Sequence, residues 1–180
     1  MNITLIGMAG AGKSYIGKHF AERYGLTFVD IDTLLAAAYR KPVQSILDEL
    51  GEAKFLDIES EMLIADTSGR DDLVISPGGS IIYRDKAMDH AKDMSTIVYL
   101  KVPFETIEMR LKKKMSRGLV GLGGRTLREL YDERMPLYDL HADITIDTAS
   151  LDLQGVLDAI IRLLSPVDAT PGSATMARNG

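Results

Sequence analysis

Short apolar runs alternate along this chain with longer segments in which apolar residues recur at helical spacing. The short runs span three to five residues, and most of them lack the polar alternation of a sheet that is half exposed to water. Runs of this kind are typical of strands that are buried on both faces. We therefore predict strands at residues 3–6, 27–29, 73–76, 96–100 and 143–146.

The segments between these runs follow the 3.6-residue period of an amphipathic helix. Strands that alternate with helices favour parallel pairing, right-handed crossovers and helices on both faces of the sheet. The pattern thus predicts an α/β fold, a three-layer doubly wound sheet of five parallel strands. The predicted helices cover residues 13–24, 32–38, 43–50, 53–65, 84–91, 104–113, 126–138 and 151–164.

Composition narrows the class of protein. With 180 residues, 46% of them hydrophobic, the chain suits a single domain, which we place at 1–165. A net charge of -5 disfavours a nucleic-acid partner, because the phosphate backbone requires clustered cations. The chain has no cysteine and no long apolar stretch, so we expect no disulfide, no membrane partner and a cytoplasmic location. Residues 166–180 are rich in Pro, Gly, Ser, Ala and Thr, which predicts a disordered tail.

The first strand leads into "GMAGAGKS" at residues 7–14, which matches the P-loop pattern G-x-x-x-x-G-K-[ST]. Glycines in such a loop let successive backbone N–H groups point at one anion, at the positive end of the following helix. Lys13 would then reach the β- and γ-phosphates, and the Ser14 hydroxyl would bind Mg²⁺. A glycine-rich turn without a ligand is the alternative. The position between strand and helix favours a nucleoside triphosphate site.

Two features separate this chain from regulatory GTPases. Their guanine-binding motif N-K-x-D cannot occur here, because Asn2 and Asn179 are the only asparagines. The segment "MLIADTSG" at 62–69 imitates a GTPase switch, but the apolar residues before it follow helical spacing. We therefore interpret Gly69 as lying near the end of a helix.

Two further segments suit the acceptor side of a phosphoryl transfer. "FVDID" at 28–32 places Asp30 and Asp32 at the carboxyl edge of the second strand, where open α/β sheets bind ligands. Alternate residues of an extended chain point the same way, so both acids would face the P-loop. The alternative is that Asp32 caps the next helix and Asp30 ends the strand. "SPGG" at 76–79 would expose backbone N–H groups to a small ligand, or form an ordinary turn.

A glycine- and arginine-rich segment follows the sixth predicted helix. It reads "MSRGLVGLGGRTLRELYDERMPLY" and combines glycines with four arginines. This composition suits a lid, at about 114–125, that brings positive charge to the transferred phosphoryl group. A solvated loop followed by a charged helix face is the alternative. The arginines are Arg117, Arg125, Arg128 and Arg134.

Several of these motifs, in this order, resemble the shikimate kinase family. The resemblance runs from the P-loop to about Thr148, through "GLTFVDID", "GEAKFLDIE", "SPGGS", "IVYLKVP", "EMRLKKKMSRGLV" and "LRELYDERMPLYDLHADITID". It implies a P-loop NTPase fold of the nucleoside-monophosphate-kinase type, with sheet order 2-3-1-4-5 and a lid. It also implies ATP and Mg²⁺ as cofactors and transfer of the γ-phosphate of ATP to a hydroxyl of shikimate.

The resemblance assigns roles to individual residues. Asp32 would accept the proton of the acceptor hydroxyl, with Lys13 and Arg117 as the other catalytic residues, and Ser14 and Asp30, helped by Ser76, would hold Mg²⁺. The predicted nucleotide-binding residues are Gly10, Ala11, Gly12, Lys13, Ser14, Tyr15, Arg110 and Arg117. The predicted acceptor-binding residues are Asp32, Gly78, Gly79 and Arg134.

Three positions depart from the family pattern. Leu56 stands where the family has an arginine that pairs with the shikimate carboxylate, Ser80 replaces a third glycine, and Gly118 follows Arg117 where a proline is usual. A charge-assisted hydrogen bond of the missing kind contributes about 1.5–3 kcal/mol, so its loss would weaken acceptor binding. Arg84 or Lys54 are candidates to compensate for Leu56.

These departures leave more than one function open. The first hypothesis is a kinase for shikimate or a similar small hydroxy acid. The second is the same chemistry on another acceptor, such as homoserine, gluconate or a nucleotide. The third is a nucleotide-binding protein without catalysis, which the complete set of P-loop and acidic residues disfavours. By resemblance we expect a monomer.

Overall fold

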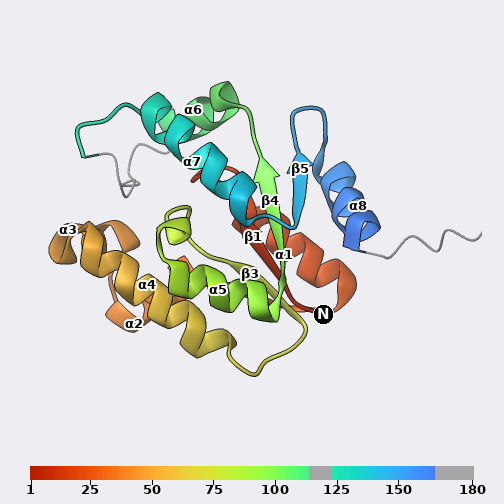
Figure 1. Ribbon diagram of the computed structural model, residues 1–180, viewed down its shortest axis with the longest axis horizontal. Helices are drawn as coiled ribbons and strands as arrows, with labels where there is room; N and C mark the ends of the chain where they lie inside the picture. The colour runs from red at the N-terminus through yellow and green to blue at the C-terminus, as the bar shows by residue number, and fades with distance from the viewer. Residues whose placement is uncertain (114–122, 165–180) are drawn as a thin grey trace, which may run out of the picture.

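The fold is built around a parallel sheet, and the computed structural model describes residues 1–113 and 123–164 (Figure 1). Five strands pair in the order β2-β3-β1-β4-β5, all of them parallel. This order and the helices on both faces confirm the predicted α/β class. The strands are β1 (Ile3–Ile6), β2 (Thr27–Asp30), β3 (Leu73–Ser76), β4 (Thr96–Lys101) and β5 (Ile144–Asp147).

Burial explains why these runs are apolar. Every residue of the central strands β1 and β3 is buried, whereas the edge strands β2 and β5 each bury one of their four residues. Central strands of a parallel sheet are covered by helices on both faces, so neither face can carry polar side chains at low cost. The predicted strand positions are confirmed to within one residue at each end.

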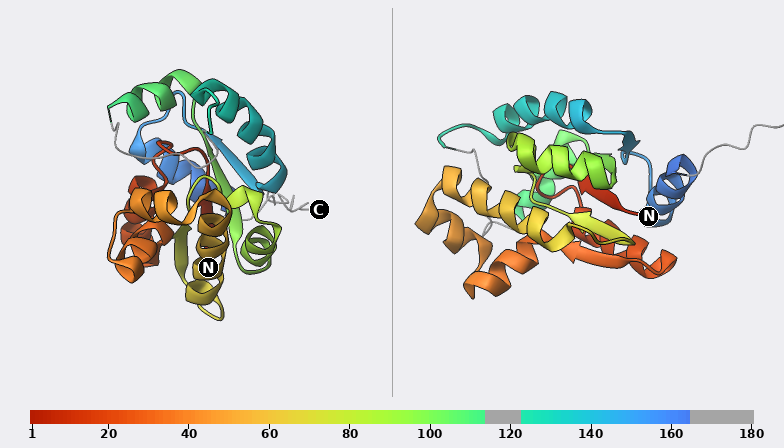
Figure 2. Two further views of the ribbon diagram at one scale, coloured as in Figure 1. Left: turned by 90° about the vertical axis from the view of Figure 1, so that its left-hand side faces the viewer. Right: turned by 60° about the horizontal axis from the view of Figure 1, so that its bottom comes forward.

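The helices form the two outer layers (Figures 1 and 2). α1 and α8 pack beside each other against one face, while α4, α5 and α7 cover the other. A short 3₁₀ turn, η1 (Ile81–Tyr83), occupies a stretch for which the sequence predicted no element. The α-helices are α1 (Lys13–Tyr24), α2 (Ile31–Tyr39), α3 (Val43–Leu50), α4 (Glu52–Thr67), α5 (Asp85–Met94), α6 (Phe104–Lys112), α7 (Leu127–His141) and α8 (Leu153–Leu164).

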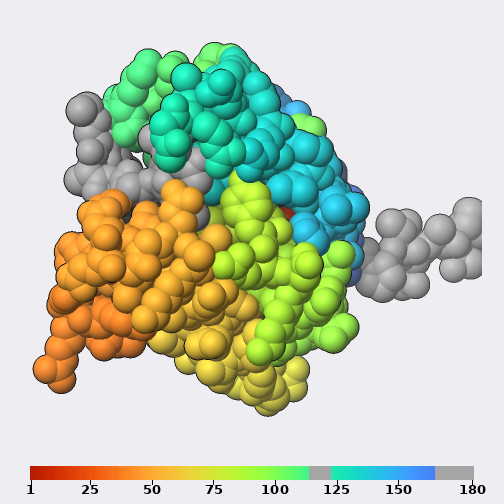
Figure 3. All heavy atoms as spheres, turned by 60° about the vertical axis from the view of Figure 1, so that its left-hand side comes forward, coloured from red at the N-terminus to blue at the C-terminus, as the bar shows by residue number. Residues whose placement is uncertain are grey.

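Two helical groups flank the end of the molecule where the strands finish. α2, α3 and α4 contact one another on one side, and α6 and α7 contact each other on the opposite side (Figure 3). The predicted lid at 114–125 falls largely outside the described residues, as does the predicted tail at 166–180. None of the helices within the described ranges is long and apolar enough to cross a membrane.

The helical interpretation of residues 62–69 is confirmed. α4 continues to Thr67, and the backbone N–H of Ser68 donates to the carbonyl of Ile64, which closes the last turn. Gly69 follows with a φ of 69°, a left-handed conformation that favours glycine. This segment is therefore the end of a helix and not a nucleotide switch.

Candidate active site

A cavity of about 970 Å³ lies at the carboxyl ends of the strands, where α/β sheets of this type bind ligands. The P-loop, the first turn of α2, a buried face of α4, the loop after β3 and the middle of α7 all line it. Segments distant in the sequence thus converge on one volume that is large enough for a nucleotide and a small acceptor. The charged residues that line it are Lys13, Asp32, Glu59, Arg110, Lys113, Arg134 and Asp152.

The P-loop has the backbone that an anion cradle requires. Gly7, Gly10 and Gly12 have φ values of 144°, 83° and 94°, a region that other residues rarely adopt. A Cβ at Gly7 would also lie 2.9 Å from the carbonyl oxygen of Leu100. α1 begins immediately afterwards at Lys13, so its unpaired N–H groups and positive dipole end face the loop. This geometry fits a polyphosphate.

Lys13 is held inside the loop. Its side chain is buried, with 8% exposed, and Nζ donates to the carbonyl oxygens of Gly7 at 2.9 Å and Met8 at 3.3 Å. Burial lowers the pKa of Lys13 to about 8, and the negative charges of Asp32 and Glu59 only partly oppose this. The ammonium is therefore less firmly protonated than an ordinary lysine and would gain from an added anion.

The two acids of "FVDID" reach different surroundings. α2 begins at Ile31, one residue earlier than predicted, so Asp32 lies in its first turn and lines the cavity from there. Asp30 is the N-cap of α2, and its Oδ1 accepts from the N–H of Thr33 at 3.0 Å. The capping alternative thus applies to Asp30 and not to Asp32. Strand alternation does not place the two acids, because Asp32 already belongs to the helix. Asp32 lines the cavity, whereas Asp30 lies outside that lining but close enough for its charge to act on Lys13.

Glu59 is a cavity residue that the sequence analysis missed. Its carboxylate is fully buried, and it accepts from the N–H of Gly78 at 2.7 Å and from the Ser80 hydroxyl at 3.4 Å. Burial raises the pKa of Glu59 to about 7, and the charge of Asp32 raises it further, while Gly78 and Lys13 act in the opposite direction. The signal in the sequence was a carboxylate one helical turn after Phe55, on the apolar face of α4.

The loop after β3 is held from both sides. The predicted acceptor-binding residues Gly78 and Gly79 both line the cavity, but the N–H of Gly78 is directed to Glu59. A Cβ at Gly78 would lie 2.2 Å from Oε1 of that carboxylate, which excludes any larger residue without rearrangement. The carbonyl of Gly79 accepts from the Tyr138 hydroxyl at 2.6 Å. Both contacts fix the backbone of this loop, which stays the predicted place of acceptor binding.

Arg134 is a buried cation on α7, with only 1% of its surface exposed. Its Nε donates to the Tyr83 hydroxyl at 3.2 Å, and it also hydrogen-bonds Tyr138. Arg134 lines the same cavity as Asp32, and its predicted role in binding the acceptor stays a prediction. Charged groups are rarely buried in proteins without an anionic or hydrogen-bonding role.

The predicted nucleotide-binding residues other than Arg117 line the cavity at the P-loop and beside it. Gly10, Ala11, Gly12, Ser14 and Tyr15 all line it. Arg110 reaches the same side from α6, and its Nη1 donates to the carbonyl of Gly10 at 3.0 Å. Arg117 lies outside the described residues, so its predicted role stays a prediction.

The proposed substitutes for the missing arginine do not reach the cavity. Leu56 packs into the core with 7% of its surface exposed. Arg84 pairs with Asp57 and donates to the carbonyl of Ala53, and Lys54 is exposed. Neither cation lines the cavity, so the idea that one of them compensates for Leu56 finds no support in the geometry.

Replacing Glu59 should change how stability depends on pH. The folded chain raises the pKa of Glu59 from its ordinary 4.5 to about 7, so folding takes up a proton between these values and stability falls as pH rises through them. We expect Glu59→Gln, which needs no charge in that site, to be more stable than the parent at pH 8 by on the order of 1–3 kcal/mol. The advantage should vanish near pH 4. Urea unfolding across this pH range measures it.

Glu61→Gln on the exposed face of α4 is the matched control, and we expect no change of slope from it. A Glu59→Gln profile that runs parallel to the parent profile from pH 4 to pH 8 would contradict the inferred burial cost.

Comparison with known proteins agrees with this geometry. The family model described as "Shikimate kinase" matches residues 9–165. The shikimate kinase of Thermodesulfovibrio yellowstonii is 36% identical over 163 residues, which cover 89% of this chain and 93% of that protein. The shikimate kinase of Persephonella marina is 34% identical over 160 residues, which cover 89% and 96%.

A solved structure extends the likeness to three dimensions. The shikimate kinase from Acinetobacter baumannii, in complex with shikimate, superimposes with a TM-score of 0.83 at 32% identity and covers 91% of this chain and 92% of its own. The match to the family model spans both the P-loop residues from Ala9 onward and Arg134. The chain therefore belongs to the shikimate kinase family, whose members are phosphotransferases that act on a hydroxyl group.

Proposed function

We propose that this chain transfers the γ-phosphate of ATP to a hydroxyl of shikimate. One observation carries the proposal: the P-loop lysine Lys13, the exposed carboxylate Asp32 and the buried cation Arg134 line the same cavity. Family membership and the shikimate complex of the A. baumannii relative support the identity of the acceptor. The cation Lys13 suits a triphosphate, the carboxylate Asp32 can accept a hydrogen bond from a hydroxyl, and the cation Arg134 suits a carboxylate.

The roles of the residues follow from the chemistry of phosphoryl transfer. Its transition state is loose and highly charged, so a protein accelerates it mainly by positioning and by fixed positive charge. The backbone N–H groups of the P-loop and the ammonium of Lys13 would bind the phosphates. Asp32 would orient the acceptor hydroxyl toward them and take up its proton. Arg134 would hold the acceptor carboxylate.

Hydroxyl and carboxylate oxygens are the donors that Mg²⁺ prefers, and this edge of the sheet offers both. We propose that Ser14, which lines the cavity, and Asp30, helped by the buried Ser76, would hold the ion. When bound, Mg²⁺ neutralises phosphate charge.

Another small hydroxy acceptor is the second candidate. The observation that favours it is Leu56, which offers no hydrogen-bond donor where the family has an arginine, while Arg84 is paired with Asp57 outside the cavity. An acceptor that makes fewer demands on positive charge would tolerate this arrangement better than shikimate.

Binding of ATP should be accompanied by proton uptake near pH 8. The pKa of Lys13 in the free chain is about 8, and a bound polyphosphate would raise it, so about half of the molecules should take up a proton at that pH. Uptake should disappear near pH 6, where Lys13 is already protonated. Calorimetry in buffers with different ionisation enthalpies measures the number of protons. Equal uptake at pH 6 and pH 8 would show that Lys13 is not the group responsible.

Asp32→Asn should separate transfer from nucleotide binding. The amide cannot accept the hydroxyl proton, so we expect the rate of ADP formation with shikimate to fall by about 10²- to 10⁴-fold. Affinity for ATP should stay within a few-fold, whereas Lys13→Met should lose both. A coupled ADP assay and calorimetry give the two quantities. Transfer by Asp32→Asn at the parent rate would remove Asp32 from its role.

An acceptor panel with Leu56→Arg tests the choice between acceptors. A guanidinium at position 56 would lie one turn before Glu59 on α4, and we expect it to lower the KM for shikimate by about one decade or more. Leu56→Met, which keeps the volume and adds no charge, is the matched control. The parent and both variants are assayed with shikimate, homoserine and gluconate. Faster parent turnover with one of the other acceptors would replace shikimate as the substrate.

A further inference from the structure

Tyr83 makes a directed contact with the buried cation of the acceptor region. It belongs to η1, which directly follows the cavity-lining loop at 76–80. Its hydroxyl accepts from Nε of Arg134 at 3.2 Å, and the guanidinium carbon lies 5.2 Å from the centre of its ring. Arg134 is therefore held against Tyr83 both by a hydrogen bond and by the ring face.

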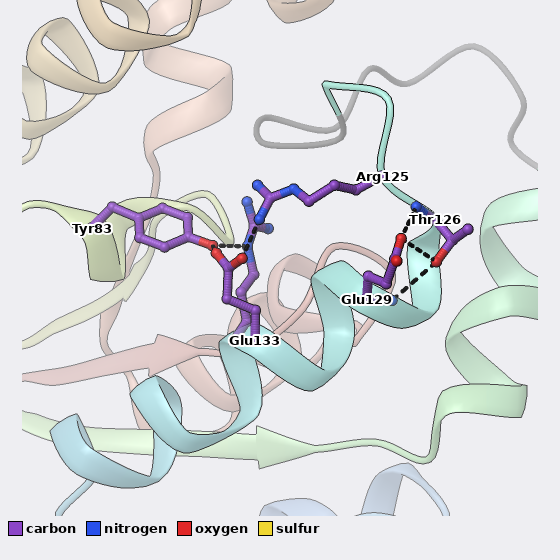
Figure 4. Close-up of polar contacts among 6 residues, drawn as sticks. Tyr83, Arg125, Thr126, Glu129 and Glu133 are labelled. Atoms are coloured by element: carbon purple, nitrogen blue, oxygen red, sulfur yellow. Dashed lines mark hydrogen bonds and ion pairs between the residues drawn. The ribbon is translucent and has the colours of Figure 1, made fainter.

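The same hydroxyl continues the contact outward. Because it accepts from Arg134, it has its own proton free to donate, and it donates to Oε1 of Glu133 at 2.5 Å (Figure 4). The other carboxylate oxygen of Glu133 forms an ion pair with Arg125, just before the start of α7. A chain of contacts thus runs from Arg125 at the surface through Glu133 and Tyr83 to Arg134 in the cavity.

Nearby charges fix which group donates and which accepts in the hydrogen bond between Tyr83 and Glu133. The hydrogen bond from Tyr83 and the charge of Arg125 lower the pKa of Glu133, so the carboxylate stays ionised. Burial and the neighbouring Glu133 raise the pKa of Tyr83, so the hydroxyl keeps its proton. The side chains of Glu133 and Arg125 are each 40% exposed, while Arg134 is buried. The contacts that orient the buried Arg134 therefore begin at an ion pair on the surface.

A second tyrosine defines what Tyr83 adds. Tyr138 hydrogen-bonds Arg134 and donates to the carbonyl of Gly79, which ties α7 to the loop that borders the acceptor. Tyr83 holds Arg134 from the other end of that loop, through η1. A guanidinium held from two directions has a fixed orientation, which favours a fixed angle toward a bound carboxylate.

We propose that Tyr83 is a positioning residue for the acceptor, which orients Arg134 through its hydroxyl and is itself oriented by Glu133 and Arg125. The proposal rests on the proposed function. Tyr83 acts through Arg134, so it should affect the acceptor and not the nucleotide, because its hydroxyl contacts Arg134 and Glu133 whereas the predicted nucleotide-binding residues centre on the P-loop.

Tyr83→Phe tests the proposal, because it removes the hydroxyl and keeps the ring. We expect the KM for shikimate to rise about 3- to 10-fold, the equivalent of one hydrogen bond, with the KM for ATP within twofold and the thermal midpoint nearly unchanged. Tyr39→Phe, an exposed tyrosine on α2, is the matched control and should change none of these values. An unchanged KM for shikimate, or an equal rise in both KM values, overturns the proposal.

Combined variants test the role of Glu133 in orienting Tyr83. Glu133→Ala should raise the KM for shikimate in the parent, because it removes the carboxylate that orients the Tyr83 hydroxyl. In the Tyr83→Phe background it should add little, because that hydroxyl is already absent. Additive effects of the two changes would overturn the order of contacts proposed.

Failure of the proposed function has a different signature. If the parent does not phosphorylate shikimate, the proposed function is wrong, but the contact between Tyr83 and Arg134 can still be tested. The Nε–H signal of Arg134 in ¹H–¹⁵N spectra reports on this contact, and comparison with Arg134→Lys assigns the signal. The signal should shift and exchange faster with solvent in Tyr83→Phe than in the parent or Tyr39→Phe. An identical Arg134 signal in all three proteins overturns the role of Tyr83 independently of any activity.

Discussion

The burial of opposite charges around one cavity is the constraint on which the site depends. Lys13, Glu59 and Arg134 are all nearly inaccessible to water, at the point where the strands end. Removal of a charge from water costs several kcal/mol unless partners replace the lost hydration. The pKa of Lys13 is lowered and that of Glu59 is raised, each away from its charged form. Burial therefore outweighs the attraction between these groups.

This imbalance gives ligands a direct energetic role. A polyphosphate in the P-loop would add negative charge next to Lys13, whose ammonium in the free chain hydrogen-bonds the backbone carbonyls of Gly7 and Met8 while the charges of Asp32 and Glu59 only partly offset its burial. A carboxylate near Arg134 would do the same on the acceptor side. The fold holds its charged groups in a costly arrangement, and the cost is offset when anions bind. Binding energy is thereby tied to the positions at which transfer would take place.

Local patterns were enough to predict much of this structure from the sequence. Buried parallel strands must be apolar, and the P-loop must follow a strand and open a helix, so their positions could be predicted closely. Contacts between distant segments could not be predicted in this way. The N–H of Gly78 meets Glu59 only because α4 passes beneath the loop after β3, and no spacing in the sequence encodes that approach. Tyr83 was missed for the same reason.

Asp30 and Asp32 show how a one-residue difference in the start of a helix changes the predicted orientation of side chains. An extended chain would place Asp30 and Asp32 on one face, but α2 begins at Ile31 and rotates Asp32 into its first turn. Asp30 then satisfies a backbone N–H that every helix start leaves unpaired. Local hydrogen bonding at the helix terminus outweighs strand alternation, and the two carboxylates take on different tasks.

Leu56 shows how the loss of a cation at one position changes what the neighbouring charged residues must bind. An arginine there would be a cation one turn from Glu59, whereas leucine joins the core and leaves that carboxylate to the N–H of Gly78 and the hydroxyl of Ser80. Neutral donors stabilise a buried carboxylate less than a guanidinium does, which is consistent with the raised pKa of Glu59. Glu59 consequently holds the loop after β3 itself, and under the proposed function recognition of an anionic acceptor would depend more heavily on how firmly Arg134 is oriented.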